Sequence, residues 1–545
     1  MTSLETNTFD ANIFVEKITH MLSQLHGVGV PQITLIETHI SWVFLTGQLV
    51  YKIKKPVNLG FVDFSTLDRR HQFCREELRL NKRLAPDLYR DVVAITDDQG
   101  KLYINGNGAI IDYAVRLQQF DPGMQFDQLL ENNQLTPEHI EAVATILANF
   151  HHKIATASST AAPLQHETPD PHGNPDTLHH ATEDNYQHCR ALLTDPVDIE
   201  NINRLSHWSN AEFRRIQAFL STRQKTGFIR ECHGDVHLGN IALYQHNVTV
   251  FDCIEFNADF RWIDVINEVS FLVMDLLSRK RQDYATLVLN TYLEITGDYE
   301  GLTSLRYYLV YRAMVRAKVE IIRASQKNIA DAHPPVTDKT ITPYHRYINL
   351  ALQLCDAKQP ILIIMHGLSG SGKSTVVKQL QTALFLVQIR SDVERKRLLR
   401  PNPATQSPSE TDKGIYSPQA SVQTYQRLHT LAERILQAGI NVVVDAAFLR
   451  KADRQRFQHL AQTLKTPFVI LHCHAEPNVL RQRIQARSTQ GNSVSDATLE
   501  VLDNQLNNRE PFEADEHSRV ISVDTLAPVQ GDALVRAILG TADTQ

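Results

Sequence analysis

The sequence predicts two domains of different fold class, an α+β domain over residues 1–326 and an α/β domain with a parallel sheet over residues 359–545. In the first part, three short β-rich segments precede a long region of helical pattern, which is typical of an α+β domain. In the second part, continuous apolar segments alternate with helical patterns, and segments of this kind are buried as strands in parallel sheets. Residues 327–358 predict a linker and a connecting helix between the two domains.

The first domain begins with the predicted strands ITLIETH, SWVFLTG and LVYKIKKPV, with a turn at Gly47. The segment Thr66–Leu84 predicts a helix that Pro86 stops. Thr136 and Pro137 form an N-cap and first-turn pair for the helix HIEAVATILANFHH. Turn residues predict a loop at Ser158–Pro175 and the linker at Lys327–Pro343. The spacing of apolar residues predicts helices at Ala211–Gln224, Leu305–Ser325 and Tyr344–Cys355.

Composition is that of an ordinary globular protein. Of the 545 residues, 42% are hydrophobic and 21% charged, so large cores can be buried, and the net charge of −6 argues against a broad nucleic-acid-binding surface. No apolar run approaches the roughly 18 residues of a membrane helix, and the start MTSLETNTFD lacks the pattern of a signal peptide, so we expect no membrane association and a cytoplasmic location. The six cysteines include no C-x-x-C pair and are expected to be reduced thiols.

A phosphate-binding loop is the strongest motif in the chain. The apolar segment ILIIMH opens directly into GLSGSGKST, a G-x-x-x-x-G-K-S pattern followed by a helix. In such a loop small residues let main-chain N–H groups surround a phosphate, the lysine reaches the β/γ oxygens and the serine hydroxyl binds Mg²⁺. The motif therefore predicts a nucleoside triphosphate site formed by Gly367, Leu368, Ser369, Gly370, Ser371, Gly372, Lys373, Ser374 and Thr375.

A second motif, His-Gly-Asp-Val-His-Leu-Gly-Asn, begins at residue 233 and is followed by the strand VTVFDCIEF. Phosphoryl transfer to an alcohol needs a carboxylate that accepts the hydroxyl proton and oxygen ligands that hold Mg²⁺. Asp235 fits the first role, and Asn240 and Asp252 fit the second. Kinases also pair a strand lysine with a helix glutamate. Lys52 fits the lysine, and the adjacent Glu76 and Glu77 both fit the glutamate, with Glu76 taken as the candidate.

The H-G-D-x-H-x-x-N motif makes residues from about 30 to 325 resemble the aminoglycoside phosphotransferase family, whose fold is similar to that of protein kinases. The resemblance implies that Asp235 is the catalytic base, that Asn240 and Asp252 bind Mg²⁺ and that Lys52 contacts the ATP phosphates, with Lys54 as a competing choice. It also implies a hinge between lobes at Ile111–Phe120. A further lobe-stabilising carboxylate has two candidates, Asp264 and Glu268, and a glycine-rich flap of the protein-kinase type is missing from the sequence.

The second domain resembles the small P-loop kinases grouped with zeta toxins and polynucleotide kinases. The segment RSDVER follows the first helix at the spacing where that family has an acceptor-activating Asp and, three residues on, an Arg, which implies these roles for Asp392 and Arg395. NVVVDAAF ends in Asp445, the expected second acidic residue near Mg²⁺. A later arginine-rich helix resembles the lid of these kinases and implies a catalytic role for Arg483, with neighbours Arg481 and Arg487.

Two histidine patterns have a metal-binding alternative that the spacing disfavours. His233 and His237 lack an obvious third ligand. On a strand, His472 and His474 face one way and Cys473 the other, so the three residues are not expected to share a metal.

Together these features predict an ATP-dependent phosphotransferase with two Mg·ATP sites, each transferring a γ-phosphoryl group to a hydroxyl of a small molecule. One alternative is a nucleotide-gated regulator in which one domain is an inactive sensor. Another makes the P-loop half a nucleic-acid 5′-hydroxyl kinase; the basic run from Arg390 to Arg400 allows it, but no aromatic-interleaved basic stripe supports it. The expected cofactors are ATP and Mg²⁺.

Overall fold

The computed structural model describes residues 10–26, 33–60, 62–156, 172–330, 342–356, 359–399, 418–490 and 499–542. The chain divides into two compact units: unit 1 contains residues 1–139, 153–174 and 223–268, and unit 2 contains residues 140–152, 175–222 and 269–545. This division follows packing, so the domain boundaries predicted around 327–358 stay a prediction. Most of the predicted loop at Ser158–Pro175 and of the predicted linker at Lys327–Pro343 lies outside the described residues.

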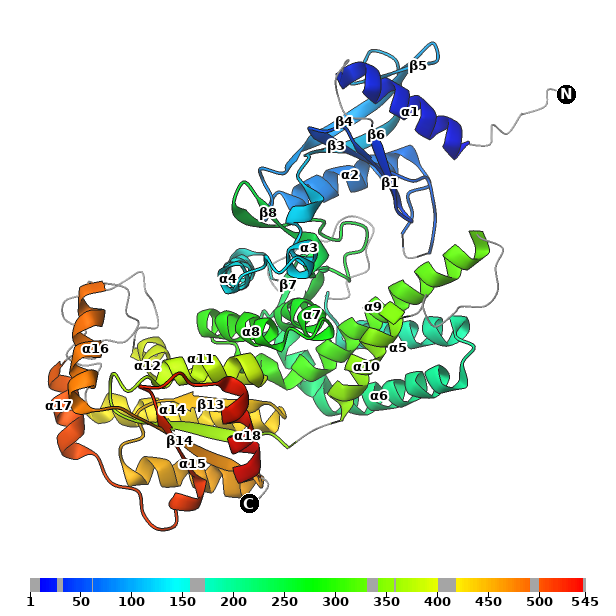
Figure 1. The fold of residues 1–545 in the computed structure, drawn as a ribbon. Coiled ribbons are helices and arrows are strands. Elements are labelled where there is room, and N and C mark those ends of the chain that lie inside the picture. Colours follow the sequence, from blue (N-terminus) through cyan, green and yellow to red (C-terminus); the bar gives the residue numbers. More distant parts are fainter. Residues whose placement is uncertain are drawn as a thin grey trace. The chain divides into compact units, whose positions relative to one another are not determined.

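Unit 1 contains an antiparallel six-stranded sheet with the strand order β1-β2-β3-β6-β4-β5 (Figure 1). The three strands predicted from the sequence are the first three of this sheet. The predicted hinge at Ile111–Phe120 is mostly strand, because β6 continues to Gln118 at the centre of the sheet. The strands are β1 (Thr34–Glu37), β2 (Ser41–Leu45), β3 (Leu49–Lys54), β4 (Tyr89–Asp98), β5 (Lys101–Ile104) and β6 (Ala109–Gln118).

Two helices pack on this sheet. Helix α2 (Leu67–Asn81) confirms the helix predicted at Thr66–Leu84, and the Thr66 hydroxyl accepts the Arg69 N–H at its start. Helix α1 (Ala11–His26) was not predicted; its apolar side, which includes Phe14, packs against the sheet residue Trp42. The described part of the first hundred residues therefore has two helices, where one was expected.

The rest of unit 1 consists of short elements that carry the His233 motif. Strands β7 (Ile229–Glu231) and β10 (Trp262–Asp264) form one antiparallel pair, and β8 (Ile241–Tyr244) and β9 (Asn247–Val250) form another. The 3-10 helix η2 (Leu238–Asn240) lies between β7 and β8. A β-bridge joins Gln125, between η1 (Pro122–Met124) and α3 (Phe126–Glu131), to Ala242 in β8. The β8–β9 hairpin thus follows the motif directly and leads to Asp252, which comes two residues after the end of β9.

Unit 2 begins with a helical region, in which the predicted helices are confirmed and extended. The helix expected at Ala211–Gln224 is the second half of α6, and the connecting helix expected at Tyr344–Cys355 is α10, which packs on α9. The helices from this part of the chain are α4 (Pro137–Lys153), α5 (Pro175–Leu192), α6 (Pro196–Lys225), α7 (Val265–Ser278), α8 (Gln282–Thr296), α9 (Leu302–Ala330) and α10 (Thr342–Cys355).

A parallel five-stranded sheet with the order β12-β13-β11-β14-β15 forms the other part of unit 2. One sheet face packs against α11 and α18 through a core that includes Ile363, Val377 and Ile538, and α14 and α15 lie on the other side (Figure 1). This arrangement confirms the predicted α/β class. The strands are β11 (Leu362–His366), β12 (Leu386–Arg390), β13 (Asn441–Asp445), β14 (Phe468–His474) and β15 (Val520–Asp524).

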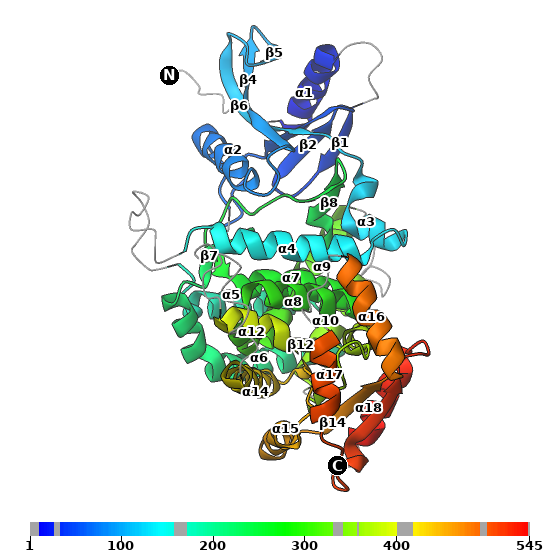
Figure 2. The same ribbon diagram turned by 90° about the vertical axis from the view of Figure 1, so that its left-hand side faces the viewer.

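The helices around the parallel sheet carry the remaining candidate residues. Helix α11 follows the phosphate-binding loop directly, and α12 follows β12. Helices α16 and α17 lie side by side (Figure 2). The helices are α11 (Lys373–Ala383), α12 (Ser391–Leu399), α14 (Pro418–Gln437), α15 (Lys451–Leu464), α16 (Pro477–Gln490), α17 (Leu499–Asn508) and α18 (Gly531–Ala542).

Candidate active sites

Lys52 is the centre of the candidate site in unit 1. It lies on β3, where its Nζ is 2.6 Å from Asp252 Oδ1 and 2.9 Å from Glu77 Oε1. The two carboxylates raise the pKa of Lys52 well above its usual value although burial opposes this. The lysine is therefore a fixed cation that joins the sheet to the candidate metal ligand.

Lys54, the competing lysine, is enclosed more deeply. Its side chain is fully buried and forms ion pairs with Glu77 and Glu255. Burial by itself would raise the pKa of Glu77, but Lys52 and Lys54 lower it to about 2. Lys54 thus holds Glu77, whereas the less buried Lys52 reaches Asp252. Glu255, three residues after Asp252, was missed by the sequence analysis because a D-x-x-E spacing alone does not indicate a buried partner.

Glu77, and not Glu76, is the glutamate that pairs with the lysines. Glu76 instead forms ion pairs with Arg79 and Arg261. Successive residues on a helix point about 100° apart, so only one of two adjacent glutamates can face the sheet. The choice of Glu76 in the sequence analysis is therefore corrected to Glu77 for this ion pair.

The catalytic-loop candidates Asp235 and Asn240 lie in direct contact. Asn240 Nδ2 donates to Asp235 Oδ2 and to the Asp235 main-chain oxygen, both at 3.0 Å. These bonds orient the Asp235 carboxylate and determine which way the Asn240 amide points. His237 Nε2 is 3.6 Å from the same Asp235 oxygen. The predicted base is thus positioned by groups from its own loop.

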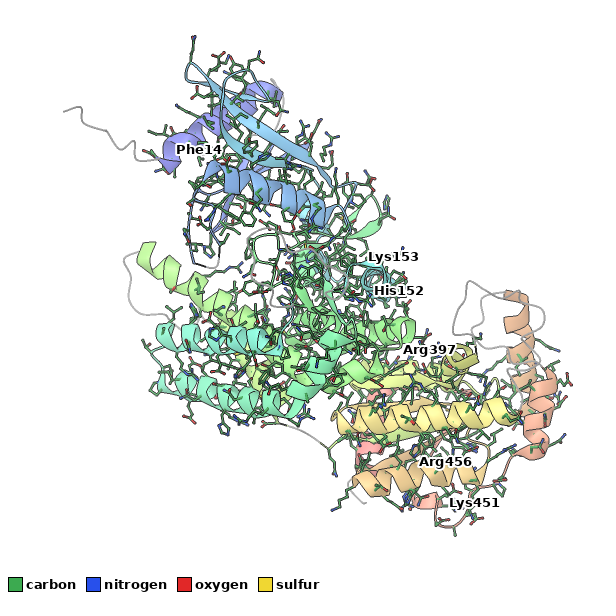
Figure 3. The ribbon with its side chains drawn as sticks, turned by 180° about the vertical axis from the view of Figure 1, so that it is seen from behind. Phe14, His152, Lys153, Arg397, Lys451 and Arg456 are labelled. Carbon is green, nitrogen blue, oxygen red and sulfur yellow. The ribbon has the colours of Figure 1, made fainter. Side chains whose placement is uncertain are left out.

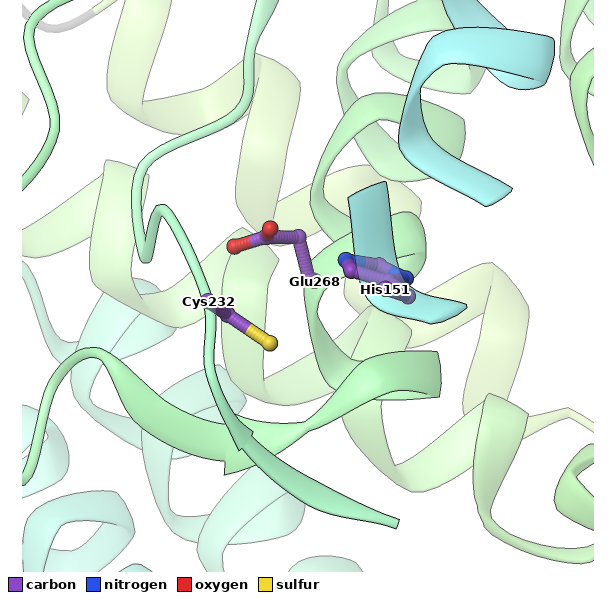
Figure 4. Close-up of side chains that lie close together, drawn as sticks. All are labelled: His151, Cys232 and Glu268. Carbon is purple, nitrogen blue, oxygen red and sulfur yellow. The ribbon is translucent and has the colours of Figure 1, made fainter. Parts of the chain in front are cut away.

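The backbone of this loop is anchored by Glu268, whose carboxylate accepts the N–H groups of His233 at 3.0 Å and of Gly234 at 2.6 Å. Figure 4 shows the Glu268 side chain together with that of Cys232. His233 Nε2 donates to the Phe251 carbonyl at 2.9 Å, and its Nδ1 accepts the Asp235 N–H at 3.3 Å. Burial lowers the pKa of His233, in keeping with this neutral form. Both ring nitrogens are engaged with the main chain, so His233 is a structural residue of the loop rather than a metal ligand.

The two candidates for a lobe-stabilising carboxylate both have buried partners. Glu268 anchors the catalytic loop as described above. Asp264 forms a buried bidentate ion pair with Arg223, in which Nε and Nη2 each donate to one carboxylate oxygen. Both residues therefore stabilise unit 1, each on a different segment.

Asp252 is the predicted metal ligand that contacts Lys52, and its backbone conformation is unusual. Its φ of 63° is in the left-handed region, which a non-glycine residue rarely adopts without a functional or structural reason. Its side chain is 45% exposed, in contrast to the buried Glu77. Carboxylate and amide oxygens are hard ligands of the type that Mg²⁺ binds, so the donor set of Asn240 and Asp252 fits this ion. Their roles as metal ligands stay a prediction.

In unit 2 the phosphate-binding loop has the backbone that its sequence requires. Gly367 and Gly372 have φ values of 151° and 84°. A side chain at Gly367 would place its Cβ 2.4 Å from the Cys473 carbonyl oxygen, so glycine is needed there. The hydroxyl of Ser371 is buried within the loop without a hydrogen-bond partner in the described part of the chain. The loop therefore has an unmet polar group where an anion is predicted to bind.

Lys373 and Ser374 begin α11 at the end of this loop. Lys373 Nζ donates to the carbonyl oxygens of Gly367 and Leu368, both at 2.9 Å. Ser374 Oγ donates to Asp445 Oδ2 at 3.2 Å, and burial raises the pKa of Asp445 although Lys373 opposes this. The serine hydroxyl and the carboxylate form an oxygen donor set that fits Mg²⁺. Ser369 and Gly370 complete the loop, and Thr375 follows on α11.

Asp392 and Arg395, predicted to act on the acceptor, both lie on α12. Asp392 Oδ2 accepts a hydrogen bond from Arg390 Nη2 at 2.9 Å, and its other oxygen accepts the Val393 N–H at 3.0 Å. Arg390 also contacts Glu294 of α8 at 3.2 Å. Glu294 was not predicted, because no local pattern in the sequence indicates a contact between residues 96 positions apart.

Arg483 of α16 contacts the phosphate-binding loop and Thr525, the residue that follows β15. Its guanidinium donates to Thr525 Oγ1 at 2.9 Å, to the Thr525 carbonyl at 2.8 Å and to the Gly370 carbonyl at 3.3 Å. These contacts hold the loop and the segment after β15 together, and the predicted catalytic role of Arg483 stays a prediction. Arg481 instead pairs with Asp503 of α17 at 2.7 Å, and the side chain of Arg487 lies outside the described residues.

The strand histidines alternate as predicted. Cys473 is part of the core beneath α11, whereas His472 faces the other side, where its Nδ1 is 2.8 Å from His366 Nδ1. Burial and the neighbouring His472 lower the pKa of His366 to about 3. All six cysteines have free thiols.

Family models match two regions of the chain. Residues 57–307 match a phosphotransferase enzyme family, and residues 362–512 match an AAA domain family of P-loop proteins. Residues 57–307 therefore form a protein-kinase-like phosphotransferase domain, and the parallel sheet belongs to a P-loop domain. Both resemblances drawn from the sequence motifs are confirmed.

Curated relatives extend over both regions. An uncharacterized protein of Mycobacterium tuberculosis is 28% identical over 471 residues, which cover 86% of this chain and 89% of the relative, and an uncharacterized protein of Mycobacterium bovis matches equally. Among solved structures, a kinase of Chloroflexus aurantiacus described as putative is 23% identical, with a TM-score of 0.27, over 34% of this chain and 98% of its own. An ethanolamine kinase of Plasmodium vivax is 8% identical, with a TM-score of 0.38, over 64% of this chain and 90% of its own.

Within the described residues, none of the helices combines the length and the apolar character that crossing a membrane requires.

Proposed function

We propose that the chain is an ATP-dependent phosphotransferase with two Mg·ATP sites, each transferring a γ-phosphoryl group to a hydroxyl of a small molecule. One observation carries this proposal: in each unit a candidate Mg²⁺ ligand lies beside another residue of the predicted site, Asp252 beside Lys52 in unit 1 and Asp445 beside Ser374 in unit 2. The family matches of the two regions support the same class of reaction.

In unit 1, Lys52 would bind the phosphates of ATP, and Glu77 holds it in place. Asn240 and Asp252 would hold Mg²⁺, which when bound neutralises charge on the phosphate oxygens. Asp235 would accept the proton of the acceptor hydroxyl while the hydroxyl oxygen bonds to the γ-phosphorus and ADP leaves. The hydrogen bond from Asn240 keeps the Asp235 carboxylate in one orientation for this step.

In unit 2, main-chain N–H groups of the loop, the start of α11 and Lys373 would bind the phosphates. Ser374 and Asp445 would hold Mg²⁺. Asp392 would accept the hydroxyl proton of the second acceptor, and Arg395, one turn further along α12, would bind that acceptor. The hydrogen bond from Arg390 orients the Asp392 carboxylate for this role.

ATP turnover by the full-length chain, measured with a panel of small hydroxyl compounds and a 5′-hydroxyl oligonucleotide, tests the proposal. Each site is silenced in turn, by Asp235→Asn or by Lys373→Ala. We expect each single variant to lose the turnover that depends on one set of acceptors and to keep the other. Phosphorylation of the oligonucleotide alone would favour a nucleic-acid kinase in unit 2. If one unit binds ATP and no acceptor ever raises its turnover, that unit is an inactive sensor and the two-site proposal is wrong.

A further inference from the structure

Helix α8 lies beside the P-loop region of unit 2, although its residues belong to the phosphotransferase match (Figure 1). It contacts both α11, the helix that follows the phosphate-binding loop, and β12. Strand β12 is at one edge of the parallel sheet, and edge strands present main-chain groups that no further strand pairs. Helix α8 therefore covers the edge that leads to the acceptor helix α12.

Asn290 of α8 forms hydrogen bonds with main-chain groups of β12, as a neighbouring strand would. Its Oδ1 accepts the Gln388 main-chain N–H at 2.6 Å, and its Nδ2 donates to the Leu386 carbonyl at 2.9 Å. A third bond, from Nδ2 to the Thr286 carbonyl at 2.9 Å, fixes the amide to its own helix. Two residues of β12 are thus held in register with α8 by one side chain.

Gln388 continues this connection to the predicted metal site. Its Nε2 donates to Asp445 Oδ2 at 3.0 Å, and the same oxygen accepts the hydrogen bond from Ser374 Oγ. The chain of contacts therefore runs from Asn290 through Gln388 to the two predicted Mg²⁺ ligands. Groups that orient a metal ligand commonly affect metal affinity or activity by 10–100-fold in proteins.

A second contact lies one turn further along the same side of α8. Glu294 pairs with Arg390, which in turn contacts Asp392. Arg397 of α12, labelled in Figure 3, donates to the Glu294 carbonyl in the last turn of α8, where a cation is favoured. Helix α8 thus approaches the predicted metal side of the site through Asn290 and the predicted acceptor side through Glu294.

We propose that Asn290 is a positioning residue of the P-loop site, acting through Gln388 on Asp445, so that a helix of the phosphotransferase domain forms part of the P-loop active site. The proposal rests on the proposed function of unit 2. It goes beyond that function because it makes the P-loop domain incomplete without α8. It also predicts that Asn290 and Gln388 act on Asp445 in series, so that losing either residue has the same effect as losing both.

The test measures Mg²⁺-dependent ATP binding to the full-length chain by calorimetry, with the unit 1 site silenced by Asp252→Asn. We expect Asn290→Ala and Gln388→Leu each to raise the Mg²⁺ concentration for half-maximal ATP binding about tenfold. Gln388→Leu keeps the main-chain N–H that Asn290 accepts, and it removes the side-chain hydrogen bonds to Asp445 and to Gln381 of α11. The double variant should shift about tenfold as well, because the second change removes nothing that the first has left intact.

Asp283→Asn is the matched control, since it removes a charge and an ion pair with Arg281 at the other end of α8 and should leave the Mg²⁺ dependence unchanged. If Asn290→Ala fails to fold, Asn290→Leu replaces it, because its side chain fills a similar volume and can make neither of the two hydrogen bonds to β12. An unshifted Asn290 variant, or a double variant that shifts about a hundredfold, would overturn the proposal. If Asp445→Asn leaves ATP binding unchanged, the proposed function of unit 2 fails, and this proposal falls with it.

Discussion

At the scale of single residues, the ion-pair cluster around Glu77 determines the candidate site of unit 1. Glu77 is fully buried and forms ion pairs with two lysines, whereas Glu76 is partly exposed and forms its ion pairs with arginines. Removing one partner of a buried ion pair leaves the other charge uncompensated. Neighbouring glutamates on one helix should therefore differ sharply in their contribution to stability.

We predict that Glu77→Gln lowers the free energy of unfolding of the full-length chain by about 3 kcal/mol, because two buried lysines lose an anionic partner. Glu76→Gln is the matched control and should change stability by less than about 1 kcal/mol. Urea unfolding at neutral pH measures both variants. Equal losses in the two variants would show that Glu77 has no special place in the fold.

Neutralising Asp235 and neutralising Asp252 should have different effects on ATP binding and on phosphoryl transfer. We predict that Asp252→Asn weakens Mg²⁺-dependent ATP binding, whereas Asp235→Asn keeps binding and loses transfer. Both variants are prepared with unit 2 silenced by Lys373→Ala, and ATP binding and turnover are measured on each. Unit 1 would be a scaffold if the silenced parent bound no ATP and Asp252→Asn had no effect.

At the scale of elements, the loop between β11 and α11 tests the P-loop assignment. Lys373→Ala should lower ATP turnover in unit 2 by about 10²–10³-fold, by analogy with the loss of one preorganised donor, while the chain stays folded. Lys378→Ala, an exposed lysine on the same helix, is the control and should keep full turnover. Steady-state rates are compared with unit 1 silenced by Asp235→Asn. Unchanged turnover in Lys373→Ala would contradict the assignment.

The predicted activation of the acceptor by Asp392 of α12 can be tested separately from ATP binding. Hydroxyl attack needs a positioned carboxylate and ATP binding does not, so Asp392→Asn should abolish transfer and leave ATP affinity near that of the parent. Arg395→Ala should instead raise the KM for the acceptor. ATP affinity and transfer are measured in parallel on both variants. A weaker ATP affinity in Asp392→Asn would place this residue in the nucleotide site.

The contact between β11 and β14 predicts a pH effect on stability. Burial and His472 lower the pKa of His366 to about 3, and Arg454, Lys373 and Arg509 add positive potential. An unfolded histidine has a pKa near 6.5, so the unfolded state binds the proton first and the stabilising effect is lost as the pH falls below about 6.5. Between pH 6.5 and 5 the loss amounts to about 2 kcal/mol.

The measurement is urea unfolding of the full-length chain at pH 7.5 and pH 5. His366→Gln should show a smaller difference in stability between the two pH values than the parent. His459→Gln, an exposed histidine on α15, should behave as the parent does. A parent-like difference in His366→Gln would show that this histidine does not carry the effect.

Local motifs were predictable from the sequence because their residues are adjacent in the chain. The loop around Lys373 and the segment from His233 to Asn240 could be recognised from short spacings alone. The sequence could not decide between Glu76 and Glu77 as the partner of the lysines. Adjacent residues lie on different faces of a helix, and which face is buried depends on where the sheet packs. Glu255, Asn290 and Glu294 were missed since their partners lie far away in the sequence, where spacing carries no signal.

At the scale of the whole molecule, family boundaries and packing do not coincide. Helix α8 belongs to the phosphotransferase match and contacts β12 of the P-loop region. The predicted boundary at residue 359 follows the change of sequence pattern, which does not reveal such a contact. A P-loop fragment cut at that boundary would leave the edge of β12 without Asn290.

The stoichiometry of Mg²⁺-dependent ATP binding to the full-length chain, measured by calorimetry, tests the central claim most directly. The account predicts two molecules of ATP per chain, because each unit has its own lysine and its own oxygen ligands. Asp252→Asn and Asp445→Asn should each remove one Mg²⁺-dependent molecule, and the double variant should remove both. A parent that binds one ATP or none, or a single variant that abolishes all binding, would contradict the account.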